Sequence, residues 1–413
     1  MKKSILPDKE PVLNRSGEVV PVSDCYLRGN EAKYLLECVK TGWVSCLGPF
    51  VEKFERAFSS YCGARYGITC SSGTAALHLA LMSVGVTCGD EVIIPSFTMV
   101  STANAVAYMG AKPVLVDATK DTFALDPEKI EAKITKKTKA IIAVHLYGHP
   151  ADMDPILKIA RKHKLAVIED AAEAHGAEYK GKRVGSIGDV ACFSFYGNKI
   201  ITTGEGGMVV TSNKKIKEQA EYMRDMAFCN VRHFWHRNLG FNYRMSNLQA
   251  AVGLAQVEQI DFLIERRRAI AATYNRYLRN VRGLTLPQEK PFAKNVYWMY
   301  TILIEAEFGM TRDMLRKKLA EHGIETRVLF VPIHLQPIYA KQCQGAFPVA
   351  EDLCRKGMYL PSGNTLTSQK IKRVCDCIKR QVNAFCFIVF AFFKIGLLLE
   401  EIVCFEGALV ICA

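Results

Sequence analysis

A lysine in an apolar, glycine-rich turn is the residue of this sequence best suited to covalent chemistry. Lys199 follows the aromatic run Phe193-Ser-Phe-Tyr-Gly-Asn198 and precedes Thr203-Gly-Glu-Gly-Gly207. Loss of water around an amine disfavours its charged form, which lowers its pKa and frees the nitrogen to attack a carbonyl carbon. The alternative is a solvated lysine, but such lysines usually sit among polar neighbours. We therefore expect Lys199 to form a Schiff base.

An acid at the end of a buried apolar run is the second candidate. Asp170 directly follows the run Leu165-Ala-Val-Ile-Glu169. A carboxylate at that place needs a partner, because burial without one would raise its pKa until it became neutral. A cationic ring nitrogen, such as that of a pyridinium, is a suitable partner. A capping aspartate with ordinary hydrogen bonds is the alternative.

A serine- and glycine-containing turn leads into the third candidate, an anion site. The residues Cys70-Ser-Ser-Gly73-Thr74 run straight into the helix-like segment 75–82. The first N–H groups of a helix have no acceptor within it, and the positive end of its dipole favours a phosphate. The alternative is an N-cap without a ligand.

Short apolar runs alternate with amphipathic segments between residues 65 and 250, and these elements must position the three candidates. The apolar runs cover residues 91–95, 113–117, 140–145, 165–169, 191–195 and 207–211. Continuous apolar runs with helices between them predict an α/β fold, in which helices cover both faces of a mostly parallel sheet. Ligands of such sheets bind beyond the carboxyl ends of the strands.

The chain is expected to divide into three parts. Residues 1–255 form an N-terminal segment, with a helix from Glu31 to near Gly42, and the large domain. Residues 256–380 form a smaller C-terminal α+β domain, which includes most of a long helix over 252–280 and a strand and a helix between 300 and 321. Residues 381–413 form an apolar tail with three open interpretations: an extra helix packed on a dimer, a membrane-associating segment, or a translated stretch outside the functional protein.

Composition limits the class of protein. With 49% apolar and 23% charged residues among 413, the chain has an ordinary globular balance. The net charge of +13 comes from scattered basic residues, which are either solvated helix faces or a field that attracts phosphates. No nucleic-acid-binding pattern is present, so a nucleic-acid partner is not expected.

The cysteines and the N-terminus indicate a cytoplasmic protein. The fifteen cysteines form no regular framework. The closest pair, Cys375 and Cys377, is spaced too tightly for a zinc site and has no second pair, so no metal is expected. We expect reduced, mostly buried thiols. Residues 1–8 lack the apolar core of a signal peptide.

Taken in order, these motifs resemble the DegT/DnrJ/StrS family of nucleotide-sugar aminotransferases, which have the fold type I of enzymes that depend on pyridoxal 5′-phosphate (PLP). The resemblance covers about residues 20–380. It rests on 71–74, on Pro95-Ser-Phe-Thr-Met99, on Glu169-Asp170, and on 194–199 with 203–207. Four further stretches are most similar to the GDP-perosamine synthases of this family: 42–45, 169–174, 241–247 and 297–298.

The resemblance implies roles for individual residues around the cofactor. Lys199 would form the internal aldimine and later move protons, and Asp170 would pair with the ring nitrogen. The phosphate would be bound by Gly73, Thr74, Ser194 and, from the second subunit of a homodimer, Asn242. Glu173 would lie near the ring hydroxyl, and Met99 would take a place that is often aromatic in the family.

The resemblance also implies a substrate pocket and a reaction. The proposed pocket residues are Trp43, Arg244, Arg327 and His334. For Trp43 a place in the core is the alternative, and for Arg327 and His334 a structural role. The implied reaction moves an amino group from L-glutamate to a nucleotide-linked 4-keto-6-deoxyhexose, for polysaccharide or glycan synthesis. The alternative function is a non-catalytic or regulatory member that binds PLP or a nucleotide-sugar, with membrane contact through the tail.

Overall fold

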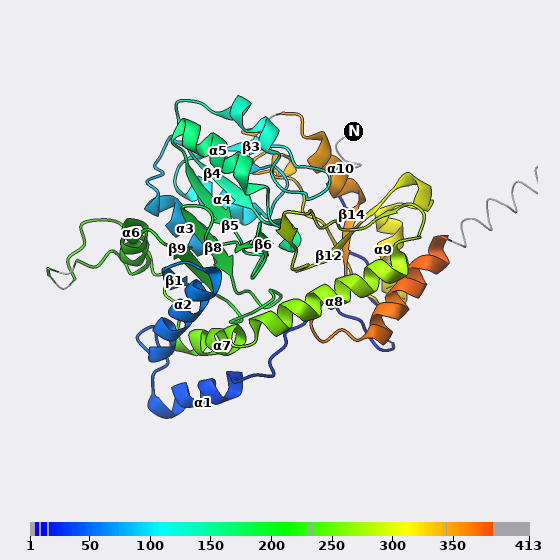
Figure 1. The fold of residues 1–413 in the computed structure, drawn as a ribbon, viewed down its shortest axis with the longest axis horizontal. Coiled ribbons are helices and arrows are strands. Elements are labelled where there is room, and N and C mark those ends of the chain that lie inside the picture. The colour runs from blue at the N-terminus through cyan, green and yellow to red at the C-terminus, as the bar shows by residue number, and fades with distance from the viewer. Residues whose placement is uncertain are drawn as a thin grey trace, which may run out of the picture.

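A computed structural model describes residues 5–7, 10–14, 16–229, 231–232, 234–343 and 345–382. The predictions made for the apolar tail lie outside these residues from 383 onward. Figure 1 shows a large α/β unit and a smaller sheet, connected by one long helix. Within the described part of the chain, no helix combines the length and the apolar character needed to cross a bilayer.

The helices lie mainly in the first two thirds of the chain. They are α1 (Glu31–Thr41), α2 (Pro49–Cys62), α3 (Gly73–Ser83), α4 (Val100–Tyr108), α5 (Met153–His163), α6 (Lys214–Arg224), α7 (Asn247–Val257), α8 (Ile260–Leu278), α9 (Arg312–Glu321) and α10 (Pro348–Lys356). A further helix is described over 368–382. The first helix ends where the sequence predicts, because Gly42 adopts the left-handed conformation with φ of 75°.

The large sheet has seven strands in the order β1-β9-β8-β5-β4-β2-β3. They are β1 (Tyr66–Cys70), β2 (Glu91–Pro95), β3 (Lys112–Val116), β4 (Thr138–Val144), β5 (Ala166–Asp170), β8 (Val190–Ser194) and β9 (Gly207–Thr211). Neighbouring strands from β8 to β3 pair in parallel. Strand β9 runs antiparallel to both of its neighbours, β1 and β8. The predicted α/β class and mostly parallel sheet are confirmed.

Both faces of this sheet are buried, as the continuous apolar runs predict. In β4, Ile142 belongs to the main hydrophobic core, whereas its neighbour Ile141 belongs to a separate core with Ile156 of α5. Successive side chains of a strand point to opposite faces, so adjacent residues serve different cores. The main core contains α2, α3 and α7, and α5 lies on the opposite face.

A second sheet follows in the C-terminal part, with the strand order β10-β12-β14-β13. Its strands are β10 (Leu284–Thr285), β12 (Tyr300–Ile304), β13 (Arg327–Val328) and β14 (Gly357–Leu360). A third, small sheet has the order β11-β6-β7, formed by β6 (Glu178–Tyr179), β7 (Lys182–Arg183) and β11 (Ala293–Lys294). Strand β12 and helix α9 match the predicted strand and helix. The domain boundaries at 255 and 380 stay predictions.

The prediction of one long helix over 252–280 is wrong, because the segment forms α7 and α8 with a break between them. Gln259 leaves the helical conformation with φ of −122° and ψ of 16°. Its side-chain amide and that of Gln256 both donate to Glu31 of α1, at 2.9 and 2.7 Å. This contact with a distant helix holds the break, and sequence periodicity does not report it.

Helix α8 then packs against both large cores. Ile260, Leu263 and Ile264 in its first turns belong to the main core. Further along, Ile270 and Tyr274 belong to the core under the second sheet. Figure 1 shows α8 running from the large unit to the smaller sheet.

Candidate active site

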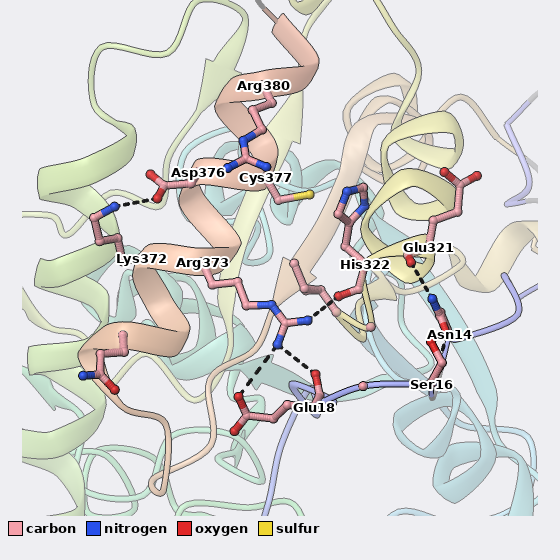
Figure 2. Close-up of a pocket in the computed structure, with 14 residues that line it drawn as sticks. Asn14, Ser16, Glu18, Glu321, His322, Lys372, Arg373, Asp376, Cys377 and Arg380 are labelled. Carbon is pink, nitrogen blue, oxygen red and sulfur yellow. Dashed lines mark hydrogen bonds and ion pairs between the residues drawn. The ribbon is translucent and has the colours of Figure 1, made fainter.

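A cavity of about 560 Å³ is lined by none of the predicted site residues. Figure 2 shows it between the N-terminal segment, the end of α9 and helix 368–382. Arg373 donates to the backbone oxygens of Glu18 and His322 at 2.8 and 2.6 Å, and Lys372 binds Asp376 at 2.6 Å. Arg373 thus attaches the N-terminal segment to the C-terminal helix, whereas the pair of Lys372 and Asp376 lies within that helix.

The second cavity, of about 440 Å³, lies at the carboxyl edge of the large sheet. Seven of the predicted site residues line it: Gly73, Thr74, Met99, Asp170, Glu173, Ser194 and Lys199. They come from the ends of β5 and β8 and from the starts of α3 and α4. Parallel strands end at one edge, so residues separated by more than a hundred positions meet there. The structure thus brings these seven residues together at one edge of the sheet.

Lys199 lies inside this cavity with its amine between a carboxyl and an aromatic ring. Its side chain is 10% exposed, and Nζ lies 3.7 Å from Oε1 of Glu173. Nζ also lies 3.8 Å from the ring centroid of Trp298. Burial lowers the pKa of Lys199, and the charges of Glu173 and Asp170 oppose that shift. The amine is thus closer to its free-base form than a surface lysine is.

Asp170 at the end of β5 is buried and only partly hydrogen-bonded. Its Oδ2 accepts from Oγ1 of Thr102 at 2.8 Å, and its Oδ1 accepts a 3.3 Å bond from the N–H of Ala172. Burial raises the pKa of Asp170, although both hydrogen bonds act against the increase. A cation in the cavity would restore the ionised form.

Glu173 follows in the same turn and faces Lys199. Its Oε2 accepts from the backbone N–H of Tyr147 at 2.9 Å. Burial raises the pKa of Glu173 to about 7, and the charge of Lys199 limits the shift. Tyr147 has a left-handed backbone conformation with φ of 52°, which is uncommon outside glycine. In this turn, its N–H points at the Glu173 carboxylate.

The start of α3 forms the opposite end of the cavity. Ser72 caps the helix by accepting from the N–H of Ala75 at 3.1 Å, and Gly73 and Thr74 supply the first helical N–H groups. A Cβ on Gly73 would lie 2.7 Å from Cβ of Ser194, and one on Gly207 would lie 2.3 Å from the oxygen of Ser72. Only glycine allows this close approach, which brings the hydroxyl of Ser194 beside the helix N-terminus.

Behind Asp170 lies Glu169, a buried acid with a complete set of partners. Its two oxygens accept from the N–H groups of Gly185, Ile187 and Gly188 at 2.8–3.0 Å. Ala151 donates to Nδ1 of His145, so the hydrogen on Nε2 of His145 points at Glu169 at 3.1 Å. Burial acts to raise the pKa of Glu169, but these hydrogen bonds outweigh it and the pKa is lowered.

Aromatic side chains from the C-terminal part complete the cavity. Trp298, Phe330 and Tyr359 line it. Trp298 precedes β12, Phe330 follows β13, and Tyr359 lies on β14. The ring of Tyr147 stacks on Trp298 and on Phe330, with interplanar angles of 6° and 16°. The C-terminal part thus contributes an aromatic wall to the cavity.

Other predicted residues lie away from this cavity. Asn242 is exposed and pairs with Asp225 through an isolated β-bridge, and Arg244 forms an ion pair with Asp225. Trp43 lies in the loop between α1 and α2 and is 50% exposed, so the alternative of a core tryptophan is wrong for the single chain.

Arg327 and His334 have structural partners. Arg327 binds Glu325 at 2.6 Å and is 43% exposed. His334 is buried, with Nδ1 2.7 Å from Oγ of Ser96 and Nε2 3.1 Å from Glu351. Neither residue is part of the cavity wall, so their assignment to the substrate pocket stays a prediction without support from this geometry.

Several residues that contact the groups of the cavity carry no clear signal in the sequence. Thr102 lies near the start of α4, and Tyr147 follows β4 in a 3₁₀ turn. Trp298 belongs to a stretch that resembles the family, and its Nε1 donates to the oxygen of Asn198 at 2.8 Å, which holds the lysine turn. Asp170 could be predicted because it is a polar residue at the end of a buried apolar run, whereas no local pattern marks the role of the other three.

The wall groups fit an aromatic aldehyde that carries a phosphate, such as PLP. A buried amine suits the aldehyde, a buried acid without a cation suits a protonated ring nitrogen, and a glycine-lined helix N-terminus suits the phosphate. The close approach at Gly73 places Ser194 next to the helix N-terminus, where its hydroxyl can join the backbone N–H groups in binding an anion.

Comparisons with known proteins agree with this geometry. Residues 26–379 match the DegT/DnrJ/EryC1/StrS aminotransferase family. The GDP-perosamine synthase of Caulobacter vibrioides is 48% identical over 349 residues, which is 84% of this chain and 94% of that protein. The GDP-perosamine synthase of Escherichia coli O157:H7 is 44% identical over 360 residues, which is 87% of this chain and 97% of that protein.

A solved structure gives the same result for the fold. The crystal structure of S. venezuelae DesV in complex with a ketimine intermediate superposes with a TM-score of 0.83 at 37% identity. The superposition covers 89% of this chain and 99% of that one.

Proposed function

Because this chain belongs to the DegT/DnrJ/EryC1/StrS aminotransferase family, we propose that its cavity binds PLP and aminates a GDP-linked 4-keto-6-deoxyhexose with L-glutamate as donor. The family consists of PLP-dependent aminotransferases of nucleotide-linked sugars, and this chain is such a transaminase. One observation carries the assignment of the site: a buried amine and a buried, incompletely paired acid line one cavity whose far end is a helix N-terminus.

The wall residues divide the task of holding the cofactor. Asp170 would pair with the ring nitrogen, and the N–H groups of Gly73 and Thr74 with the hydroxyl of Ser194 would bind the phosphate. Met99, which is 47% exposed in the cavity, would lie against the ring. When bound, PLP supplies an electron sink that makes loss of a proton from the amino-bearing carbon feasible.

Lys199 performs the proton transfers in this proposal. Its Nζ would hold PLP through the aldehyde and would be released when a substrate amine binds there. The released amine then lies in a buried site with a lowered pKa, where it acts as a base and afterwards as an acid. Both half-reactions use the same cavity in turn, first with glutamate and then with the keto-sugar.

The aromatic wall is the proposed surface for the sugar. Phe330 and Tyr359 line the cavity with aromatic rings, and the ring carbons and methyl group of a 6-deoxyhexose suit such faces. Asn242 and Arg244 lie outside the cavity of their own chain. In a homodimer, they would reach the site of the second subunit.

The reaction is tested with a panel of GDP-, dTDP- and UDP-linked 4-keto-6-deoxyhexoses, each incubated with ¹⁵N-glutamate and analysed by mass spectrometry. We expect a mass gain for the amino sugar with the GDP-linked substrate. The variant Lys199→Ala should lose the transfer by about 10⁴-fold and lose the visible absorbance of lysine-bound cofactor. Lys214→Ala, on the exposed face of α6, serves as the control and should keep both.

Two outcomes contradict the proposal. An unchanged absorbance band in Lys199→Ala refutes the lysine assignment. Cofactor binding without amino transfer to any keto-sugar favours the non-catalytic alternative. The cytoplasmic location expected from the sequence is part of the proposal and is tested by fractionating cells that express the full chain.

A further inference from the structure

Two buried groups of opposite charge face each other in the cavity, and the proposed function uses only one of them. Nζ of Lys199 lies 3.7 Å from Oε1 of Glu173, and the side chains are 10% and 7% exposed. We propose that the two groups share one proton, so that the Glu173 carboxylate accepts the proton of the Lys199 ammonium and returns it. This inference rests on the proposed function, in which Lys199 is alternately a free base and a proton carrier.

The carboxyl is held in an orientation that suits this exchange. Oε2 is fixed by the backbone N–H of Tyr147 at 2.9 Å, so Oε1 remains directed at the amine. The left-handed backbone of Tyr147 shows that the turn is shaped to supply this N–H. On the other side of the amine, the face of Trp298 at 3.8 Å stabilises the ammonium without accepting its proton.

The other titratable groups around the pair are less suited to accept the proton. Burial and the charge of Lys199 lower the pKa of the His175 ring to about 3, so this ring binds a proton only weakly. Asp170 has both oxygens bonded, to Thr102 and to Ala172. The phenols of Tyr147 and Tyr359 have raised pKa values because they are buried, and they stay neutral. Glu205 lines the cavity but is exposed to solvent. Among the described residues, Glu173 is the acid within ion-pair distance of Lys199.

Burial brings the proton affinities of the two groups together. It raises the pKa of Glu173 to about 7 and lowers the pKa of Lys199, because both charged forms lose solvation. In the transfer, one N–H bond of the ammonium breaks, its electron pair stays on nitrogen, and an O–H bond forms at Oε1. The net charge of the cavity does not change, and no other reactant is needed.

The test measures the proton affinity of Lys199 in the full-length chain freed of cofactor. A short pulse of acetic anhydride is given at a series of pH values, and acetylation of Lys199 is quantified by mass spectrometry. In Glu173→Gln the midpoint of reactivity should move down by about one pH unit or more, because no carboxylate stabilises the ammonium. Glutamine keeps an oxygen for the N–H of Tyr147, so the turn is preserved.

The matched control is Glu205→Gln, which removes an acid from the same cavity that is not paired with the amine. Its midpoint should equal that of the unmodified chain. An unchanged midpoint in Glu173→Gln overturns the proposal. An equal shift of the midpoint in both variants also overturns it, because the shift would then come from the overall electrostatic field of the cavity and not from Glu173.

A reciprocal measurement keeps the test decisive if Glu173→Gln does not fold. In Lys199→Met, infrared difference spectra at pH 8 should show an additional protonated carboxylic acid, since the ammonium no longer favours the carboxylate. Spectra without that band contradict the shared proton. Both measurements use cofactor-free protein, so a failure to aminate keto-sugars would refute the proposed function and leave this result standing.

Discussion

Two acids adjacent in the chain, Glu169 and Asp170, end the same buried strand and have opposite surroundings. Glu169 accepts hydrogen bonds from three backbone N–H groups and from Nε2 of His145, and its pKa is lowered. Asp170 accepts two hydrogen bonds, and its pKa is raised. The pKa of Glu173 is raised as well. Burial alone does not identify a functional acid: an acid with a full set of partners stabilises the fold, whereas one that lacks them faces the cavity and is available to a ligand.

Among changes to these acids, the largest effect on amino transfer is expected from Asp170→Asn. Asparagine has the same shape: its one oxygen can still accept from the N–H of Ala172, and its NH₂ can donate to Oγ1 of Thr102. The folding free energy should therefore change by less than about 1 kcal/mol. The negative charge for a ring nitrogen is lost, so amino transfer from ¹⁵N-glutamate should fall by about 10²–10³-fold. Activity within tenfold of the unmodified enzyme would place Asp170 among the structural acids.

Glu169→Gln should give the reverse result. One amide oxygen cannot accept from three N–H groups and a histidine, and its NH₂ would face donors. We expect a loss of about 3–5 kcal/mol in the free energy of unfolding, measured by urea denaturation. A loss below 1 kcal/mol would show that the hydrogen bonds around Glu169 contribute little.

The contribution of the two kinds of acid to folding stability should also change with pH in opposite directions. The lowered pKa of Glu169 gives stability that is present above the pKa of the unfolded chain and is lost as the pH falls. The pKa of Glu173, raised from 4.5 to about 7, gives the opposite: stability present below 4.5 is lost as the pH rises through about 7, by up to about 3 kcal/mol.

This sign difference is measured on cofactor-free chains from about pH 3 to pH 8. The stability difference between the unmodified chain and Glu169→Gln should grow as the pH rises toward 4.5 and then level off, because the pKa of Glu169 is lowered from 4.5. The stability difference for Glu173→Gln should decline between pH 4.5 and about 7. Slopes of the same sign for the two variants would remove the distinction between the two acids.

The smallest effect is expected from Thr102→Val, which removes one of the two hydrogen bonds of Asp170. Valine has nearly the same shape, so the helix should be unaffected. The Kd for PLP should rise by about tenfold or less, which corresponds to about 1 kcal/mol. A cofactor titration by absorbance measures it, and a much larger loss would mean that Thr102 contacts the cofactor itself.

Much of the large sheet could be predicted from the sequence, because each buried strand is a continuous apolar run. Strand β1 was missed, since Gly67 and Thr69 interrupt its apolar pattern. Helix α2 was missed although a signal exists: Pro49 at its start and Phe50, Phe54 and Phe58 at helical spacing. That spacing is typical of a helix with one buried face.

The site could be predicted only in part, for a physical reason. Lys199 and Asp170 stand out because their local surroundings are unusual for a charged group. Trp298, Phe330 and Tyr359 are aromatic residues in ordinary strand contexts, and the packing of the second sheet alone brings them to the lysine. His334 had no local pattern, and the structure gives it the partners Ser96 and Glu351.

Helix α8 has a consequence for how the protein unfolds. Its first turns complete the main core and its later turns complete the core beneath the second sheet. Melting this helix would expose both cores at once, so the two parts of the chain should lose structure in a single cooperative transition. A fragment cut at residue 255 would carry an uncovered apolar surface where Leu263 and Ile264 normally pack, and it should aggregate when expressed alone.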